Sequence, residues 1–279
     1  MKLGKFELHL IEDGIFHLDG GAMFGVVPKV MWAKTNPADA ENRIELVLQC
    51  LLIRTGQHNI VVDTGLGDKM KDRFLEIYSV DRTRNLRGGL EEQGLKPEDI
   101  DLVINTHLHF DHCGGNTVLG PDRRPVPAFP NARYIVQQAE WDEATNPNER
   151  TKASYLPENF MPIMEAGQLT LAHGEQEVIP GVHLMPTSGH TRGHQMVKIV
   201  SQGETAIYMG DLIPLVSQIR LPFVMSYDLY PMVTIEVKRA FLRQAAAEHW
   251  LLIFDHDPKF TMGYLAVENG ELKLEPVSA

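Results

Sequence analysis

The sequence predicts an α/β fold, because short apolar runs typical of strands alternate with segments of helical character along the whole chain. Histidine and aspartate residues directly follow several of the apolar runs, in each half of the chain. No low-complexity linker and no short-period repeat divides the sequence. We therefore expect one domain, residues 1–279, built from two similar halves.

The N-terminal segment predicts a hairpin followed by an irregular loop. Lys5–Ile11 and Gly14–Leu18 have the pattern of strands, and the Glu12-Asp13-Gly14 sequence between them is a turn signal. Asp19–Trp32 is apolar, with three glycines and a proline, and has neither the helical nor the strand period. Such a segment indicates a loop that is folded over a cavity or packed into the core.

The rest of the chain alternates between strands and helices. We expect strands at Glu45–Arg54, Asn59–Val62, Leu102–Ile104, Asn131–Val136, Leu169–Ala172, Val182–Pro186, Val197–Ser201, Thr205–Met209, Leu251–Phe254 and Thr261–Val267. We expect helices at Asp68–Tyr78, Leu86–Gln93, Gln138–Thr145, Tyr155–Glu165 and Val233–His249. The last is the clearest, since Val233, Val237, Phe241 and Ala245 lie near one stripe.

Composition and charge exclude several classes of function. The net charge of -11 and the pI of about 5.5 disfavour binding to nucleic acid, whose phosphates an acidic surface repels. The two cysteines, Cys50 and Cys113, form no C-x-x-C motif, which argues against a disulfide framework and a thiolate zinc site. Met1–Phe16 lacks the apolar core of a signal peptide, and no apolar window is long enough to span a membrane. We expect a cytoplasmic protein with neither membrane nor nucleic-acid partners.

The strongest motif is Asp101–Asn116, which reads DLVINTHLHFDHCGGN. Residues two apart in an extended chain point the same way, so His107 and His109 can reach one ion together. Asp111 and His112 follow, where the glycine pair after Cys113 signals a turn. Three histidines and an aspartate at this spacing predict a metal site.

Further candidate ligands lie at the ends of other predicted strands. The sequence SGHTRGH at Ser188–His194, MGD at Met209–Asp211 and FDHD at Phe254–Asp257 each follow an apolar run. Ligand sites in α/β sheets usually gather at the carboxyl ends of the strands. Asp63 ends another such run and is placed to accept a hydrogen bond from a metal-binding histidine.

Taken in order, the motifs THLHFDH, SGHTRGH, MGD and DH resemble the pattern of the metallo-β-lactamase superfamily. The resemblance runs from about Ile44 to His256. Asp19–Trp32 and Tyr227–Met232 are similar to the YtnP-type branch of probable quorum-quenching lactonases. The family implies an αββα sandwich with a two-metal site at one edge of the sheets.

The resemblance also implies a ligand set. His107, His109 and His190 would hold the first metal ion, Asp111, His112 and His256 the second, and Asp211 would bridge the two. His194 resembles a structural histidine that supports the ligand loop. Nitrogen and oxygen ligands without thiolate suit two divalent ions, zinc first, with iron, cobalt or manganese as alternatives.

The activity implied by the resemblance is opening of the lactone ring of N-acyl homoserine lactones and related lactones. A hydroxide held between the metal ions would attack the carbonyl, and Asp111 would pass a proton to the leaving group. A phosphotriesterase or another carboxyl-ester or thioester hydrolase on the same site is the alternative. The family further implies a homodimer.

One position departs from the family pattern. Well-studied acyl-homoserine lactonases have a tyrosine three residues after the bridging aspartate, where this chain has Pro214. Tyr227 and Tyr230 are candidates to replace it, with ordinary packing as the alternative for both. For the acyl chain of a substrate, the candidate contacts are Met23, Phe24 and Trp32.

Overall fold

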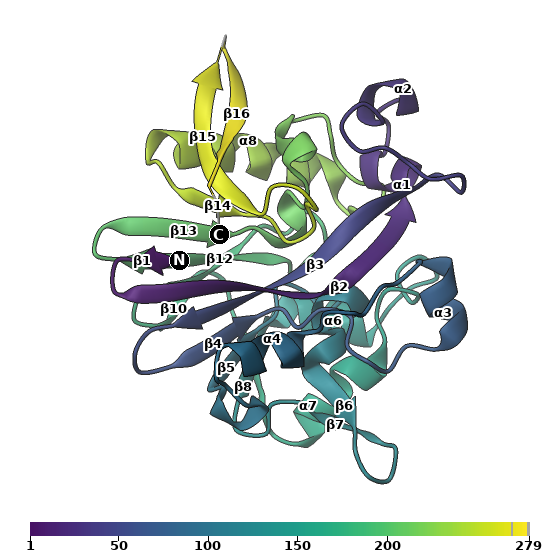
Figure 1. Cartoon of the computed structure of the whole chain (residues 1–279), viewed down its shortest axis with the longest axis vertical. Coiled ribbons are helices and arrows are strands. Elements are labelled where there is room, and N and C mark those ends of the chain that lie inside the picture. The colour runs from purple at the N-terminus through teal and green to yellow at the C-terminus, as the bar shows by residue number, and fades with distance from the viewer. Residues whose placement is uncertain (269, 278–279) are drawn as a thin grey trace.

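Two facing seven-stranded sheets with helices on their outer sides make up the fold, as the computed structural model shows for residues 1–268 and 270–277 (Figure 1). The strands of the first sheet are β1 (Lys2–Leu3), β2 (Phe6–Asp19), β3 (Arg43–Arg54), β4 (Asn59–Val62), β5 (Leu102–Ile104), β8 (Arg133–Gln137) and β9 (Leu169–Ala172), in this order across the sheet. Those of the second are β10 (Gln176–Ile179), β11 (Val182–Pro186), β12 (Gln195–Ser201), β13 (Glu204–Tyr208), β14 (Leu251–Ile253), β15 (Met262–Glu268) and β16 (Glu271–Pro276). The predicted αββα sandwich is confirmed.

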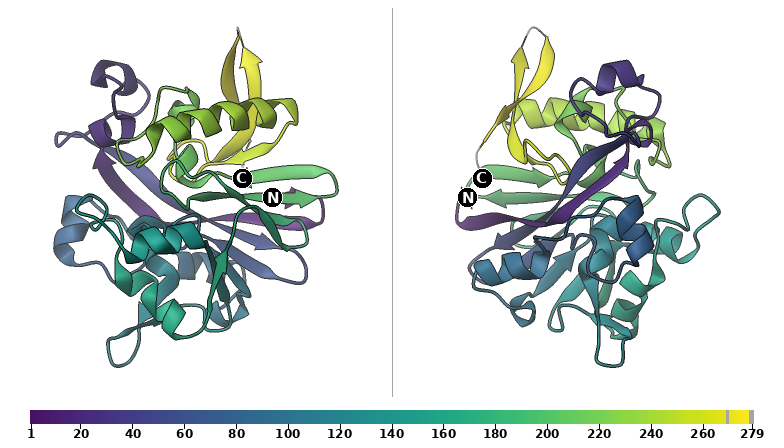
Figure 2. Two further views of the ribbon diagram at one scale, coloured as in Figure 1. Left: turned by 180° about the vertical axis from the view of Figure 1, so that it is seen from behind. Right: turned by 45° about the vertical axis from the view of Figure 1, so that its right-hand side comes forward.

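Eight α-helices connect and cover the sheets within the described residues. They are α1 (Gly20–Phe24), α2 (Lys29–Trp32), α3 (Asp72–Ile77), α4 (Leu86–Glu92), α5 (Phe110–Cys113), α6 (Gln138–Thr145), α7 (Met161–Glu165) and α8 (Pro231–Ala247). Helix α8 lies along the outer side of the second sheet, while α4, α6 and α7 lie on the side of the first (Figure 2). A small hairpin of β6 (Thr117–Leu119) and β7 (Pro125–Pro127) stands apart from both sheets.

Strand direction brings the motif-bearing loops to one edge. Strands β4, β5 and β8 are parallel in the first sheet, and β13 and β14 are parallel in the second. The carboxyl ends of parallel strands meet at the same edge of a sheet, where ligand sites in such sheets usually form. The loops after β4, β5, β13 and β14 contain Asp63, His107, Asp211 and His256 respectively.

The main core lies between the two sheets. Side chains from β3 to β5, such as Ile53 and Ile104, form one buried cluster with side chains from β12 to β14, such as Ile199 and Ile253. On the outer side, α8 buries Phe241, Leu242 and Ala245 against the second sheet. The sheets are therefore joined by a continuous apolar layer, which stabilises the fold by the hydrophobic effect.

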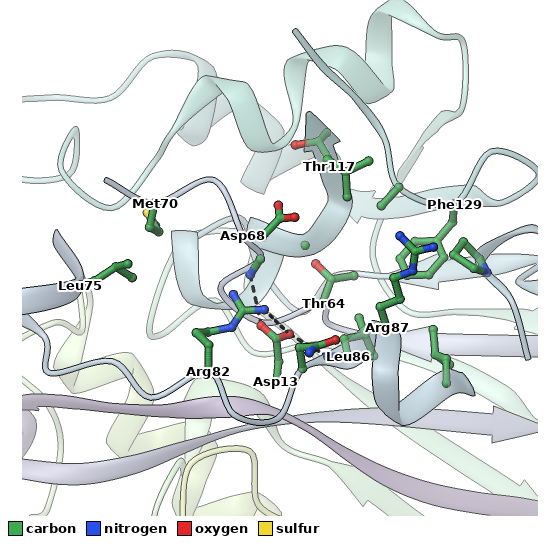
Figure 3. A pocket seen from close by; sticks show the side chains of 17 residues that line it. Asp13, Thr64, Asp68, Met70, Leu75, Arg82, Leu86, Arg87, Thr117 and Phe129 are labelled. Atoms are coloured by element: carbon green, nitrogen blue, oxygen red, sulfur yellow. Dashed lines mark hydrogen bonds and ion pairs between the residues drawn. The ribbon is translucent and has the colours of Figure 1, made fainter. Parts of the chain in front are cut away.

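The predicted N-terminal hairpin is wrong. Residues 6–19 form one strand, β2, and the turn signal at residues 12–14 is instead an irregularity in its pairing with β3, between Glu12 and Ile15. The buried carboxylate of Asp13 accepts hydrogen bonds from the backbone N–H groups of Leu66, Gly67 and Leu86. It also pairs with Arg82 (Figure 3). These partners satisfy a polar residue inside the fold, so the strand continues past it.

Other boundaries differ from the predictions as well. Asp19–Trp32 contains the two short helices α1 and α2, the first capped by the Asp19 carboxylate, which accepts from the Ala22 N–H. The helix predicted from Asp68 begins at Asp72, and the segment 155–165 contains only one α-helix, the short α7. The buried face of helix α8 differs from the predicted stripe, since Val233 is exposed and Lys238 is buried.

No helix among the described residues has the length and apolar character needed to cross a membrane.

Candidate metal centre

The structure brings the seven predicted metal ligands together at the edge between the two sheets. His107, His109, Asp111 and His112 follow β5, while His190, Asp211 and His256 follow β11, β13 and β14. All seven are buried, Asp111 being the most exposed at 9%. Six of the seven, all but Asp111, supply potential ligand atoms to two clusters, and within each cluster these atoms lie within 4.8 Å of one another.

The first cluster consists of His107, His109, His190 and Asp211. The Nε2 atom of His190 lies 3.1 Å from Nδ1 of His109 and 3.0 Å from Oδ2 of Asp211. Two imidazole nitrogens this close cannot both carry protons, so at least one lone pair faces the centre of the cluster. Three nitrogen donors and one carboxylate oxygen form a set suited to zinc.

The second cluster consists of His112, Asp211, Asp255 and His256. The Nε2 atoms of His112 and His256 are 3.2 Å apart and lie 3.6 and 3.4 Å from Oδ1 of Asp211. Asp211 therefore presents a different oxygen to each cluster. The carboxylate of Asp111 approaches the second cluster too, with Oδ2 3.8 Å from the same two nitrogens.

Contacts behind the rings hold several histidines in place. Nδ1 of His112 lies 3.0 Å from Oδ2 of Asp63, as the sequence led us to expect for that carboxylate. Nδ1 of His190 lies 3.0 Å from Oδ1 of Asp228, and Nδ1 of His256 lies 2.8 Å from the Val47 carbonyl oxygen. Such acceptors fix the tautomer with Nε2 free, which is the form that binds metal.

The electrostatics of the centre reflect many charged groups buried together. Although burial opposes the charged form of His256, the carboxylates of Asp255 and Asp211 raise its pKa to about 9. Burial and the neighbouring histidines lower the pKa of His107 and His109 well below the usual value. The carboxylates thus favour positive charge on His256 in the second cluster, while His107 and His109 in the first favour the neutral form that can bind a cation.

The residues present fit divalent cations. Nε2 of His107 and Oδ1 of Asp211 are buried and have no hydrogen-bond partner among the described residues. Buried polar atoms are normally paired, and these two atoms belong to the clusters of converging donors. A cation coordinated by these atoms would satisfy both of them and relieve the close approach of the imidazole nitrogens.

His194 and Glu140 contact the segments that contain the predicted ligands but are not themselves in either cluster. The His194 ring lies 5.3 Å from the His107 ring, and its Nδ1 is 2.6 Å from the Thr187 hydroxyl. It belongs to neither cluster. The buried Glu140 carboxylate accepts from the Leu108 N–H, between the first two histidines, and from the Thr191 hydroxyl, next to His190.

A cavity of about 320 Å³ opens onto the metal centre and is lined by side chains that include His109, Asp111 and Asp211. Met23, Tyr78, Arg150 and Tyr227 contribute to its walls as well. This cavity differs from the one beside Asp13 in Figure 3, whose walls contain none of the predicted ligands.

The predicted substrate residues divide between this cavity and other places. Phe24 and Trp32 are stacked on each other in the core, with ring centroids 5.2 Å apart, and line no part of the cavity. The Tyr230 hydroxyl donates to Glu143 and lies outside the cavity as well. Met23 and Tyr227 are the two predicted contacts that the structure places in the walls.

The sequence reasoning missed five residues at this centre: Tyr78, Glu140, Arg150, Asp228 and Asp255. Asp228 lies in the segment Tyr227–Met232 and Asp255 in the motif Phe254–Asp257, so both are carboxylates within segments that the sequence singles out. Glu140 lies in the first turn of α6, distant in the sequence from Leu108 and Thr191, and nothing in its local sequence marks it. Tyr78 and Arg150 come from segments with no motif at all.

Several known proteins are similar to this chain. An N-acyl homoserine lactonase of Bacillus sp is 34% identical over 57% of this chain and 60% of its own length. The chain thus spans about 60% of the lactonase relatives that it matches. The crystal structure of a probable metal-dependent hydrolase from Staphylococcus aureus is 33% identical, covers 100% of both chains and has a TM-score of 0.90. AidC, a dizinc quorum-quenching lactonase, has a TM-score of 0.83 at 22% identity over 100% of this chain and 97% of its own, which shows the shared fold.

A family model agrees with these likenesses and with the geometry of the centre. The model described as the metallo-beta-lactamase superfamily matches residues 45–256, a range that includes both ligand clusters. With its two sheets, its outer helices and its strand-end histidines and aspartates, the chain belongs to the metallo-β-lactamase superfamily.

Proposed function

We propose that this chain is a metal-dependent hydrolase that opens the lactone ring of N-acyl homoserine lactones and related lactones. The observation that carries the proposal is the pair of ligand clusters sharing Asp211, placed at the wall of a cavity that is partly apolar and large enough for a small ester. Lactonase relatives at 31–34% identity and the Staphylococcus aureus hydrolase support the same class of reaction.

The proposed site holds two divalent ions, zinc by preference. His107, His109 and His190 hold one ion, Asp111, His112 and His256 hold the other, and Asp211 lies between them. When bound, such ions lower the pKa of a coordinated water and polarise the carbonyl oxygen of an ester. The chain's own part is to fix the ligand geometry, through Asp63 on His112 and Asp228 on His190.

Two cavity residues act on protons in this proposal. Asp111 borders the cavity and passes a proton to the leaving alkoxide as the ring opens. Burial and the nearby Tyr78 and Asp111 raise the pKa of Tyr227, so its hydroxyl stays protonated and donates a hydrogen bond to the substrate. Tyr227 thereby takes the place of the donor that is absent at Pro214.

Met23 lines the cavity and provides an apolar contact for the acyl chain. One methylene more or less in an apolar pocket changes binding by only about 1–3 kcal/mol. The proposed enzyme therefore accepts lactones with a range of chain lengths. We also expect a homodimer, which light scattering of the purified chain tests.

Metal analysis of the purified chain, followed by rates on lactone, phosphotriester and thioester substrates with the same preparation, tests the proposal. Two ions per chain and the highest kcat/KM on acyl homoserine lactones are expected. His109→Ala should abolish turnover, whereas His183→Ala, a change on a strand away from both clusters, should not. A higher kcat/KM on triesters or thioesters would assign the site to the alternative chemistry, and two bound ions without any hydrolysis would contradict an enzyme.

A further inference from the structure

We propose that Asp255 is an additional protein ligand of the second ion and makes that position richer in oxygen donors than the first. The inference rests on the proposed two-ion site but not on which ester is cleaved. Asp255 lies directly before His256, in the loop after β14.

The first argument is that the Asp255 carboxylate is buried without a partner. The residue is 1% exposed, and neither of its oxygens has a hydrogen-bond partner among the described residues. A buried carboxylate in this condition is costly unless a cation or donors compensate it.

Two other buried aspartates near the centre, Asp257 and Asp63, accept hydrogen bonds from protein donors. Asp257, two residues further, accepts from the N–H groups of Val216, Lys259 and Phe260. Asp63 accepts from the N–H and the hydroxyl of Thr106. The other aspartate whose buried oxygen lacks a partner in the described part of the chain is Asp211, itself a predicted ligand. Asp255 thus shares the condition of the ligands and differs from the aspartates that only support the fold.

The second argument is the direction of the side chain. One carboxylate oxygen of Asp255 lies in the same set as His112, Asp211 and His256, with the potential ligand atoms within 4.8 Å of one another. Its Oδ2 is 3.8 Å from Nε2 of His256. Ligand atoms about 2.0–2.2 Å from a shared cation lie roughly 3–3.5 Å from their neighbours, so a small adjustment brings Asp255 into coordination.

The two positions would then differ in chemistry. The first has three imidazole nitrogens and one oxygen from Asp211. The second has two imidazole nitrogens and carboxylates from Asp111, Asp211 and Asp255. Oxygen-rich sets favour harder ions such as manganese, while imidazole-rich sets favour zinc. Zinc at the first position and manganese at the second is therefore the expected distribution when both ions are supplied.

Anomalous diffraction from crystals of the wild-type chain, soaked with zinc and manganese, tests the inference directly. The expected result is an Asp255 oxygen about 2.0–2.3 Å from the second ion, with the manganese signal concentrated there. An Asp255 carboxylate further than about 3 Å from an occupied second position overturns the inference while leaving the two-ion site intact. A chain that binds no cation would overturn both proposals.

Metal affinity of a variant gives a second readout that requires no turnover. Asp255→Asn keeps the shape of the side chain and removes its charge, while Asp257→Asn is the matched control on the same loop. Changes in groups that only hydrogen-bond to a ligand already cost about 10–100-fold in affinity, so loss of a charged ligand should weaken the second ion at least tenfold. The control should bind both ions as the wild type does. Equal affinities in the Asp255→Asn variant and the wild type would contradict a ligand role.

Discussion

Asp228 Oδ1 lies 3.0 Å from Nδ1 of His190, on the opposite side of the imidazole ring from the Nε2 atom that faces the first cluster. The other oxygen of Asp228 accepts from the Met225 N–H, which fixes the carboxylate in turn. Through this contact, the loop that contains Tyr227 also orients a candidate metal ligand. The cavity wall and the metal centre are thus parts of one connected arrangement.

Removing the Asp228 carboxylate should weaken metal binding. Asp228→Ala takes away the acceptor that holds the His190 tautomer, and we expect the affinity of the first ion to fall by about 10–100-fold. Isothermal titration of the metal-free chain with zinc measures the change. The control is Asp122→Ala, an exposed aspartate far from the centre, which should bind zinc normally. An unchanged affinity in the Asp228 variant would show that the contact does not orient the ligand.

The two tyrosines of the segment 227–232 provide a matched pair. Tyr227→Phe should lower kcat/KM for lactones by about tenfold, the effect of one lost hydrogen bond of about 1–1.5 kcal/mol. Tyr230→Phe should leave kcat/KM unchanged, because that hydroxyl donates to Glu143 outside the cavity. Steady-state kinetics give kcat/KM for both variants. A Tyr227→Phe variant with the same kcat/KM as the wild type and Tyr230→Phe would remove Tyr227 from the mechanism.

Neighbouring residues of helix α1 should give opposite effects. Met23→Ala enlarges the cavity, so kcat/KM for a decanoyl lactone should rise relative to that for a hexanoyl lactone. Phe24→Ala should lower the free energy of unfolding by about 3–5 kcal/mol, since Phe24 is fully buried against Trp32. Its chain-length preference should stay that of the wild type. A shift in preference only in the Phe24 variant would mean that the acyl chain binds elsewhere.

Lys238 predicts a pH dependence of stability. It is fully buried in α8, and its ammonium group donates to the Arg220 and Phe223 carbonyl oxygens. Burial lowers its pKa from 10.5 to about 7. Above pH 7 the folded state loses this proton, while the unfolded chain keeps it up to about pH 10. Burial of Lys238 therefore lowers the free energy of unfolding by its full amount below pH 7, and by less as the pH rises toward 10.

The measurement is the free energy of unfolding of the wild type minus that of Lys238→Met, at pH 7 and at pH 9. This difference should rise by about 2 kcal/mol over that interval. At pH 7 to 9 the unfolded chain carries a proton on Lys238 that folding must release, and releasing it costs less free energy as the pH rises. Subtraction removes the pH dependence of the metal ligands, which both proteins share. A difference that stays flat or falls would show that Lys238 keeps an ordinary pKa.

Strands and strand-end ligands could be predicted from the sequence because their signals are local. The apolar run at Leu102–Ile104 forms β5 as expected, and the histidines after it converge with those of the second half. Asp13 shows the limit of such signals. A turn sequence and a bulge contain the same residue types, and the choice between them depends on the Leu66, Gly67 and Leu86 N–H groups from distant segments.

The same limit applies to the centre. Asp228 and Glu140 contact His190 and Leu108, which are distant in the sequence, and Asp255 lies near His112 and Asp211 only in the folded chain. No periodicity in the sequence marks such residues. The sequence predicts Phe24 and Trp32 near the substrate because they belong to an apolar segment without a regular period, but apolar side chains fill cores as readily, as these two do. The assignment of individual ligands, and of one domain over residues 1–279, stays a prediction.

Each ligand cluster takes residues from both sheets. His109 and His190, 81 positions apart, meet in the first cluster, and His112 and His256, 144 positions apart, meet in the second. A bound cation would therefore act as a cross-link between the two halves of the chain, in the manner of a reversible disulfide. Since an ion that binds the folded chain alone stabilises it in proportion to the logarithm of its concentration, the free metal level of the surroundings would set the melting temperature of this protein as well as its activity.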